Sequence, residues 1–309
     1  MKKGPTLITL VKRLQRERGL WSPGAHLLCA CSGGPDSTAA LHALAWLRDD
    51  FGHRVSAVGV DHGLRQGALA ELEGAARLSE QLGISFEVRT VSVTPGPNLQ
   101  ARAREARHGS LQAVAQARRA DGIVLGHTAD DRAETVLMRL MRGSGLRGLA
   151  VMPPRAAGLG GPFPLLRPLL LARRTDVLAH LERHGVAWSE DPSNRDPQFF
   201  RSRVRSEILP RLEALSPRVV DHLNRLAAEL NDDVFDAGDD PWADMTRGQR
   251  EALAHAVRSG RSGTKVRLAG GRDVELRFSR SHTSGTRAEP SGPREDDVSP
   301  AKRKNCADT

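Results

Sequence analysis

Several residue types are scarce in this chain of 309 residues, and each scarcity excludes a class of protein. Tyrosine is absent, and the three cysteines, Cys29, Cys31 and Cys306, have neither the spacing of a zinc site nor the number of a disulfide framework. We therefore expect a reducing, cytoplasmic compartment. Cys29 and Cys31 alternate along an expected strand, so both are expected to be small core residues on the same side of a sheet.

Long apolar runs and lysine are also scarce. No apolar stretch reaches the roughly 20 residues of a bilayer-crossing helix, and Met1-Lys2-Lys3 leads into an amphipathic segment rather than into a signal-peptide core. A membrane partner is therefore not expected. Because no lysine occurs between Lys12 and Lys265, that interval cannot hold the Gly-Lys-Ser or Gly-Lys-Thr of a Walker loop.

Basic residues are in excess, with a formal net charge of +9. Residues 281–309 hold five basic and five acidic residues, so the excess lies in residues 1–280. Clustered arginine binds phosphates and releases counterions, which favours a nucleic-acid partner. The last segment, 281–309, is rich in small polar residues and poor in large apolar ones, so we expect it to be disordered.

A glycine-containing segment, Ser32-Gly33-Gly34-Pro35-Asp36-Ser37, follows the apolar run 25–30 and precedes a helix-like stretch over 37–47. Glycines allow positive φ, so successive N–H groups can converge on an anion, and the helix dipole adds to this attraction. The segment therefore predicts a phosphate-binding loop. The alternative is a Gly-Pro turn in which Asp36 or Ser37 is an ordinary helix N-cap.

Strand-like and helix-like stretches alternate in the first half of the chain. The apolar runs cover 26–31, 55–60, 86–91 and 123–126, and the helical stretches cover 37–48, 69–82, 98–117 and 130–142. This alternation predicts an α/β fold with an open, mostly parallel sheet and helices on both faces. Ligands of such sheets bind at the carboxyl ends of the strands, where the candidate loop lies.

The second half of the chain reads as mainly helical. Residues 153–168 are expected to leave the sheet, and helices are expected near 173–184, 200–213 and 217–231. A linker over 231–242, a helix over 246–259 and a hairpin over 265–278 would complete a small α+β appendage. We therefore expect three parts, over residues 1–215, 216–280 and 281–309. The pattern G-x-G-x-x-G at 143–148 ends an expected helix, so it is not a dinucleotide fingerprint.

Further motifs follow the loop in order, at 60–65, 98–107, 125–135, 142–145, 167–170, 190–194 and 201–205. Together with residues 32–37 they resemble the tRNA(Ile)-lysidine synthetases of the PP-loop, or N-type ATP pyrophosphatase, superfamily, whose fold is adenine nucleotide α-hydrolase-like. The resemblance covers about residues 20–215. Two positions depart from it, because Gln100 stands where many relatives carry Glu and Ser202 where Asn is common.

The resemblance implies an ATP-dependent ligation. The C2 oxygen of the wobble cytidine in the CAU anticodon of tRNA(Ile) would attack the α-phosphate of ATP, and lysine would then displace AMP to give lysidine, which changes codon reading from AUG to AUA. The implied partners are ATP, Mg²⁺, free L-lysine and this tRNA. The sequence leaves open whether the chain acts as a monomer or a homodimer.

The resemblance also assigns roles to residues. The backbone of Ser32, Gly33, Gly34, Pro35 and Ser37 would hold pyrophosphate, Asp36 would bind through Mg²⁺, and Asp61 and His62 would line the adenosine pocket. Arg107 would contact the ATP phosphates. The tRNA or the activated base would meet four arginines: Arg142, Arg201, Arg203 and Arg205. For these arginines the alternative is a solvated helix face.

Asp131 and Glu134 are three residues apart on an expected helix, so they share one face. They could hold the lysine amine and relay its proton, since the side chain must be deprotonated to attack; an acidic first helical turn is the alternative. The resemblance gives His127 a role in neutralising phosphate charge or positioning the base. The alternative is that His127 is a simple packing residue. A zinc site from His62 and His127 lacks a ligand spacing.

Two other functions remain as rivals. A PP-loop tRNA thiolase would be expected to carry Cys-x-x-Cys pairs, which are missing here. A non-catalytic nucleotide- or tRNA-binding protein would not need the intact loop or the paired carboxylates.

Overall fold

The computed structural model describes residues 5–61, 68–92, 96, 99–158, 160–189, 198–236, 264–267 and 273–276. The chain divides into two compact units, residues 1–238 and 239–309. Residues 216–236, which the sequence analysis grouped with the appendage, thus lie in the first unit.

A sheet of six strands forms the centre of the first unit in the described part of the chain, in the order β3-β2-β1-β4-β6-β5. Its strands are β1 (His26–Ala30), β2 (Arg54–Asp61), β3 (Ser85–Thr90), β4 (Gly122–Val124), β5 (Arg155–Ala156) and β6 (Leu165–Leu166). All neighbours pair in parallel except β5, which is antiparallel to β6. This confirms the expected open, mostly parallel sheet.

The strand order reverses at β1. The chain runs outward from β1 through β2 to β3 and then returns to place β4 on the other side of β1. The loops after β1 and β4 therefore diverge at a switch point, which is where an open α/β sheet forms its ligand crevice. The expectation that residues 153–168 leave the sheet is wrong, because β6 pairs with β4 and carries β5 at the edge.

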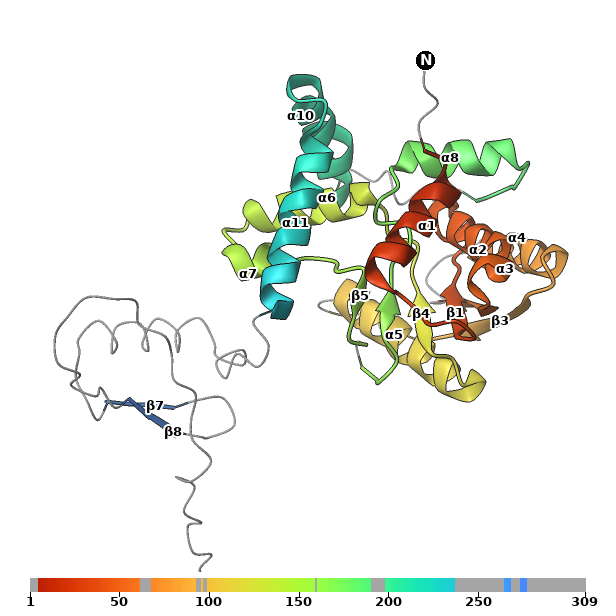
Figure 1. The fold of residues 1–309 in the computed structure, drawn as a ribbon, viewed down its shortest axis with the longest axis horizontal. Coiled ribbons are helices and arrows are strands. Elements are labelled where there is room, and N and C mark those ends of the chain that lie inside the picture. Colours follow the sequence, from red (N-terminus) through yellow and green to blue (C-terminus); the bar gives the residue numbers. More distant parts are fainter. Residues whose placement is uncertain are drawn as a thin grey trace, which may run out of the picture. The chain divides into compact units, whose positions relative to one another are not determined.

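Helices cover both faces of this sheet, as Figure 1 shows. They are α1 (Leu7–Arg18), α2 (Pro35–Trp46), α3 (Arg48–Phe51), α4 (Ala68–Gln81), α5 (Leu99–Arg118), α6 (Ala129–Leu140), α7 (Leu146–Leu149), α8 (Arg174–Arg183), α9 (Phe200–Arg203), the π-helical turn η2 (Val204–Ile208), α10 (Leu209–Leu215) and α11 (Val219–Asp236). One core packs α1, α2, α4 and α8 on one face, and a second packs α5 on the other.

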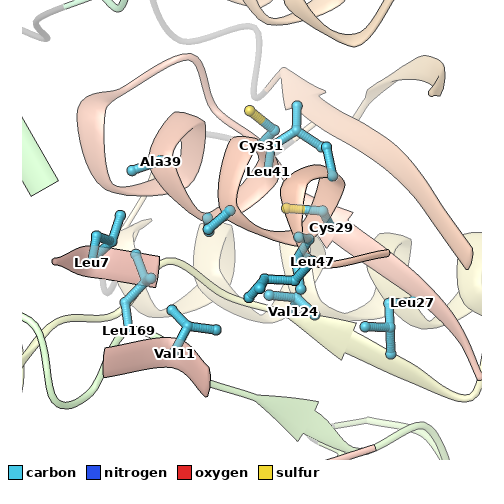
Figure 2. Close-up of a cluster of buried hydrophobic side chains, with 14 of the residues drawn as sticks. Leu7, Val11, Leu27, Cys29, Cys31, Ala39, Leu41, Leu47, Val124 and Leu169 are labelled. Atoms are coloured by element: carbon cyan, nitrogen blue, oxygen red, sulfur yellow. The ribbon is translucent and has the colours of Figure 1, made fainter. Parts of the chain in front are cut away.

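Strand β1 shows why two cores form. Leu27 and Cys29 face the first core, whereas Leu28 and Ala30 face the second, as the period of two along a strand requires. Cys31 follows on the side of Cys29, and Figure 2 shows both sulfur atoms among the apolar side chains of that core. The expectation that both cysteines are core residues is confirmed.

Two expected helical features differ in the structure. The stretch 200–213 is interrupted by η2, where the Leu209 N–H donates to the Val204 carbonyl, five residues back. Pro210, next in the chain, has no N–H to continue an α-helical ladder, which accounts for the bulge. The linker expected from 231 begins later, because α11 extends to Asp236 and buries Asn231 against the Val151 carbonyl.

The second unit contains an antiparallel pair, β7 (Thr264–Arg267) and β8 (Asp273–Leu276), which confirms the expected hairpin. The expected helix 246–259 and the segment 281–309 lie outside the described residues. Within the part of the chain that the structure describes, no helix is long and apolar enough to cross a membrane.

Candidate functional site

The phosphate loop, residues 32–37, joins the end of β1 to the start of α2. Gly33 has φ +83°, and a Cβ there would collide with the Glu71 backbone. The Gly33 carbonyl accepts the Ser189 N–H at 2.9 Å. Gly34 is the N-cap of α2 and has no side chain to occupy the first N–H groups of that helix. The loop therefore presents unscreened backbone donors to an anion.

The Ser37 hydroxyl closes the loop on itself. Its oxygen accepts the Ser32 N–H at 3.1 Å, lies 3.2 Å from the Ser32 hydroxyl and donates to the Gly34 carbonyl at 3.0 Å. Ser37 is buried, whereas Ser32 is exposed. Ser37 thus fixes the loop from within, and Ser32 lies on its open side.

Asp36, in the first turn of α2, has a carboxylate that is only partly satisfied by hydrogen bonds and ion pairs. Its side chain is 23% exposed, its Oδ2 lies 4.0 Å from Arg174 Nη1, and its buried Oδ1 has no hydrogen-bond partner. Burial, followed by the negative charge of Asp131, raises the pKa of Asp36 to about 6. A buried carboxylate oxygen that lacks a donor and has a second carboxylate close by suits a hard cation such as Mg²⁺.

Gly126, just beyond β4, forms the back of the phosphate loop. A Cβ at this position would lie 2.7 Å from the Asp36 carbonyl carbon and 2.8 Å from the Ser37 nitrogen. The main chain after β4 can therefore pass directly behind the start of α2 only because residue 126 is glycine. This close approach brings His127 beside the loop.

His127 is a half-buried, neutral imidazole. Burial lowers its pKa to about 4; Asp131 opposes this shift, while Arg167, Arg201 and Arg107 reinforce it. Arg167 Nε donates to His127 Nδ1 at 3.2 Å, and Arg167 Nη1 donates to the Pro153 carbonyl at 2.8 Å. Because Nδ1 accepts, the ring proton lies on Nε2, so His127 can donate one hydrogen bond.

Four side chains form a charge cluster: Asp131, Glu134, Arg201 and Arg205. Asp131 Oδ1 accepts from Arg201 Nη2 at 2.8 Å and from Arg205 Nη2 at 3.2 Å. Glu134 Oε2 accepts from Arg201 Nε at 2.8 Å and from Arg205 Nη2 at 3.0 Å. The structure therefore confirms that the two carboxylates share a face, and it shows that two guanidinium groups occupy them.

Local chemistry fixes the orientation of Asp131. Thr128 and Asp131 form a capping box at the start of α6, in which Asp131 Oδ2 accepts from both the N–H and the hydroxyl of Thr128. Burial alone would raise the pKa of Asp131, but Arg201 and the other donors around it hold this pKa below its ordinary value. Asp131 is thus a fixed carboxylate, in contrast to Asp36.

The other predicted arginines lie apart from this cluster. Arg201 and Arg205 are four residues apart on one helical face, whereas Arg203 is exposed and pairs with Glu207 at 3.4 Å. Arg142, just after α6, stacks its guanidinium over the Phe200 ring, 5.6 Å from the centroid. The four arginines assigned to tRNA therefore occupy three separate environments.

Arg107 makes no hydrogen bond or ion pair with any residue that the structure describes. Burial, then the neighbouring Arg104, lowers its pKa. Its positive charge helps to lower the pKa of His127, so Arg107 lies near that ring. An unpaired, desolvated guanidinium is suited to bind an incoming phosphate.

Asp61 is buried at the carboxyl end of β2, where its carbonyl accepts the Val91 N–H at 2.8 Å. His62 lies outside the described residues, as does the motif at 190–194. Among the described residues no group of three or more His, Cys, Asp or Glu side chains could hold a metal ion. That finding gives no support to the zinc alternative.

Sequence reasoning missed several side chains of this region. Arg167 lay within a matched motif but received no role. Arg173 was not noticed, although its guanidinium binds both Asp130 and Glu213. Arg174 was also missed; its N–H donates to Asp130 and its guanidinium faces Asp36. Gly126 was visible as a glycine after a strand, a signal of close backbone approach.

Comparisons with known proteins agree with this architecture. A family model described as the PP-loop domain matches residues 6–212. The tRNA(Ile)-lysidine synthase of Thermobifida fusca is 43% identical over 244 residues, which cover 78% of this chain and 72% of that protein. The tRNA(Ile)-lysidine synthase of Pseudomonas fluorescens is 40% identical over 231 residues, covering 74% of this chain and 51% of that protein.

The chain thus spans about half the length of some of these relatives and nearly three quarters of others. Among solved structures, the U34-tRNA thiolase NcsA of Methanococcus maripaludis, determined with its 4Fe-4S cluster, is similar with a TM-score of 0.61 at 22% identity. The match covers 73% of this chain and 80% of that one. At this identity the likeness concerns the fold alone.

Proposed function

The chain belongs to the tRNA(Ile)-lysidine synthase family of PP-loop proteins, and from that premise we propose that it joins lysine to the wobble cytidine of tRNA(Ile) at the expense of ATP. The observation that carries the proposal is that three features lie together at one switch point of the sheet. They are the phosphate loop, the charge cluster and Asp36, whose buried Oδ1 accepts no hydrogen bond from the described residues. These are the parts that nucleotidyl transfer followed by amine attack requires.

The first step is adenylation of the base. The cytidine O2 attacks the α-phosphorus of ATP, the bond from that phosphorus to the bridging oxygen breaks, and pyrophosphate leaves. The backbone of residues 32–37 binds the departing phosphates, with Ser37 holding the loop closed. Arg107, which pairs with none of the residues that the structure describes, adds positive charge. Asp61 and His62 are assigned to the adenosine.

Asp36 would hold Mg²⁺ through its free Oδ1. When bound, this ion would neutralise phosphate charge that the loop backbone alone cannot. His127 is neutral and keeps its proton on Nε2, so we assign it to orienting the base or a phosphate oxygen by donating a hydrogen bond. Charge neutralisation then falls to Arg107 rather than to His127.

The second step is attack by the lysine ε-amine on C2 of the adenylated base, with cleavage of the C2–O bond and release of AMP. We assign the ammonium group of lysine to Asp131 and Glu134, one of which accepts its proton. Since Arg201 and Arg205 occupy these carboxylates, lysine must displace a guanidinium. Arg201, whose side chain is 37% exposed, is the more easily displaced of the two.

The tRNA partner accounts for the basic character of the chain. Arg142, Arg201, Arg203 and Arg205 are assigned to its phosphates or to the activated base, and residues 216–280 to further tRNA contacts. The cytoplasm is where such a substrate is found. A thiolase function has less support, because Cys29 and Cys31 are buried in the core and burial raises the pKa of both thiols.

The test is incorporation of radiolabelled lysine into a tRNA(Ile) transcript with a CAU anticodon, in the presence of ATP and Mg²⁺. Methionine tRNA, which has the same anticodon, is the control. We expect lysine incorporation into the isoleucine tRNA alone. Release of AMP without lysine incorporation would point to a different nucleophile, and absence of AMP with either tRNA would reject the enzyme.

A further inference from the structure

Exposed apolar side chains occur at the end of α6 and at the start of α9, and the stacking of Arg142 on Phe200 brings these two segments together. Two neighbouring phenylalanines at the start of α9 are exposed, Phe199 by 41% and Phe200 by 39%. Leu140 and Met141 at the end of α6 are exposed by 44% and 47%. We call this set, together with Arg142, the aromatic edge. Large apolar side chains grouped at a surface mark an interaction site.

The stretch of chain around Arg142 is cationic. Residues 135–149 contain three arginines, Arg139, Arg142 and Arg147, and no acidic residue. The Arg142 guanidinium lies over the Phe200 ring at 5.6 Å from its centroid, so a planar cation and an aromatic ring are already stacked. A surface that combines aromatic faces with arginine complements a polyanion that carries aromatic bases.

The aromatic edge is continuous with the candidate active site. Phe200 is followed by Arg201, whose guanidinium reaches Asp131 and Glu134 on the first turns of α6. Arg142, beyond the other end of α6, lies over Phe200. The segment from Phe200 to Arg205 therefore runs along α6, from the last residues of that helix toward its first turns. A nucleic-acid ligand that reaches the charge cluster thus has the aromatic edge beside it.

We propose that the aromatic edge binds the unpaired anticodon nucleotides that flank the reacting cytidine, with their bases stacked on Phe199 and Phe200 and a phosphate on Arg142. This inference rests on the proposed function. Unpaired bases of an RNA loop are free to stack on aromatic side chains, which single-strand recognition commonly uses. A protein partner would meet three arginines without an acidic neighbour in the same segment, which favours RNA.

The test measures binding of a 17-nucleotide anticodon stem-loop of tRNA(Ile), with 2-aminopurine placed next to the CAU cytidine, to the full chain. Phe199→Ala and Phe200→Ala should each weaken binding by about 10-fold or more and should restore the fluorescence that stacking quenches in the wild type. Phe200→Trp should retain both. The matched control is Leu215→Ala, since Leu215 is 85% exposed at the end of α10, and it should change neither.

Three outcomes would overturn the proposal: no binding of the stem-loop by the wild type, equal binding by the alanine variants, or weaker binding without any change in fluorescence. Sedimentation of the same variants gives a fourth: loss of a homodimer with unchanged stem-loop affinity would assign the aromatic edge to self-association. Failure of the proposed function looks different. In that case the wild type would bind the stem-loop through Phe200 yet incorporate no lysine.

Discussion

The phosphate loop and the charge cluster lie at the same switch point but are built in opposite ways. The phosphate loop is made by six consecutive residues, and its backbone N–H groups at the start of α2 have no capping side chain. The charge cluster joins side chains that are 67 and 71 residues apart, on α6 and on α9 with η2. A local motif can thus specify an anion cradle, whereas the paired charges depend on the whole fold.

The carboxylates of the two regions also differ in their surroundings and in the direction of their pKa shifts. Asp36 accepts no hydrogen bond from the two nearby guanidinium groups, Arg174 and Arg205, and has a raised pKa, whereas Asp131 accepts hydrogen bonds from two guanidinium groups and has a lowered pKa. Neighbouring carboxylates whose pKa values are driven apart are typical of sites in which they have different roles. This difference supports the proposed roles, in which Asp36 serves ATP and the two carboxylates of the charge cluster serve lysine.

The largest expected effect follows from Asp36→Asn. Adenylation should fall by about 100-fold or more, because the cation site loses its charge. The same variant should be more stable. The carboxylate, with a pKa of about 6 instead of 3.8, costs up to about 3 kcal/mol of folding free energy above pH 6.

Urea unfolding tests this cost as a function of pH. The stability difference between Asp36→Asn and wild type should be full above pH 6 and should vanish below pH 3.8, where Asp36 is protonated in both folded and unfolded states. A variant that is inactive and also less stable at pH 7.5 would show that Asp36 is a structural residue. Wild-type adenylation should itself fall as pH drops through about 6.

Next in size is the effect of Glu134→Gln on the charge cluster. The Glu134 side chain is 1% exposed, and its loss of charge leaves two guanidinium groups short of a partner. We expect the free energy of unfolding to fall by about 2–3 kcal/mol, less than for a fully buried pair because the arginines reach solvent. Glu207→Gln, which breaks the exposed pair with Arg203, should cost under about 0.5 kcal/mol. Equal losses of unfolding free energy in Glu134→Gln and Glu207→Gln would contradict the expectation that the buried charge cluster contributes more to stability than the exposed pair.

Gly126→Ala tests the packing behind the phosphate loop. The added methyl group meets the Asp36 and Ser37 backbone, so we expect a loss of about 1–3 kcal/mol and weaker ATP binding, measured by calorimetry. Gly109→Ala is the control: it lies within α5 with no atom within 4 Å of the new Cβ, and it should stabilise the protein by up to about 1 kcal/mol. Unchanged ATP affinity in Gly126→Ala would mean that the close approach is dispensable.

Arg201→Gln tests whether lysine competes with arginine for the carboxylates. Removal of a partly exposed competing charge should lower the KM for lysine by about threefold to tenfold, while kcat falls because a base contact is lost. Arg203→Gln should leave the KM for lysine unchanged. A higher KM in Arg201→Gln would show that Arg201 supports the lysine site instead of occupying it.

The smallest effect concerns His127. Arg167→Met removes both a positive charge and the donor to Nδ1, so the pKa of His127 should rise from about 4 toward 6.5. Imidazole titration by NMR measures this directly. Arg155→Met, which removes a hydrogen bond to the Leu20 carbonyl, should leave the titration unchanged. Identical titration in both variants would show that Arg167 does not hold down the pKa of His127.

Features set by local pattern were predictable from the sequence. The presence of β1 to β4 along the chain, the placement of Cys29 and Cys31, and the loop at 32–37 follow from alternation and glycine chemistry. Strands β5 and β6 were missed because two-residue strands in a Pro- and Gly-rich segment have no periodicity to detect. The pairing of Arg201 and Arg205 with Asp131 and Glu134 could not be foreseen, since it depends on how α9 and η2 lie against α6.

The most direct test of the account is transfer of label from α-³²P-ATP to tRNA(Ile) in the absence of lysine. We expect labelled tRNA with wild type and with Asp131→Asn, which keeps the capping geometry, and no labelled tRNA with Asp36→Asn. Addition of lysine should release the label as AMP from the wild type far faster than from Asp131→Asn. Two results would contradict the assignment of adenylation to the phosphate loop and of the lysine step to the charge cluster: label that appears on lysine instead of on tRNA, or tRNA that stays unlabelled with Asp131→Asn.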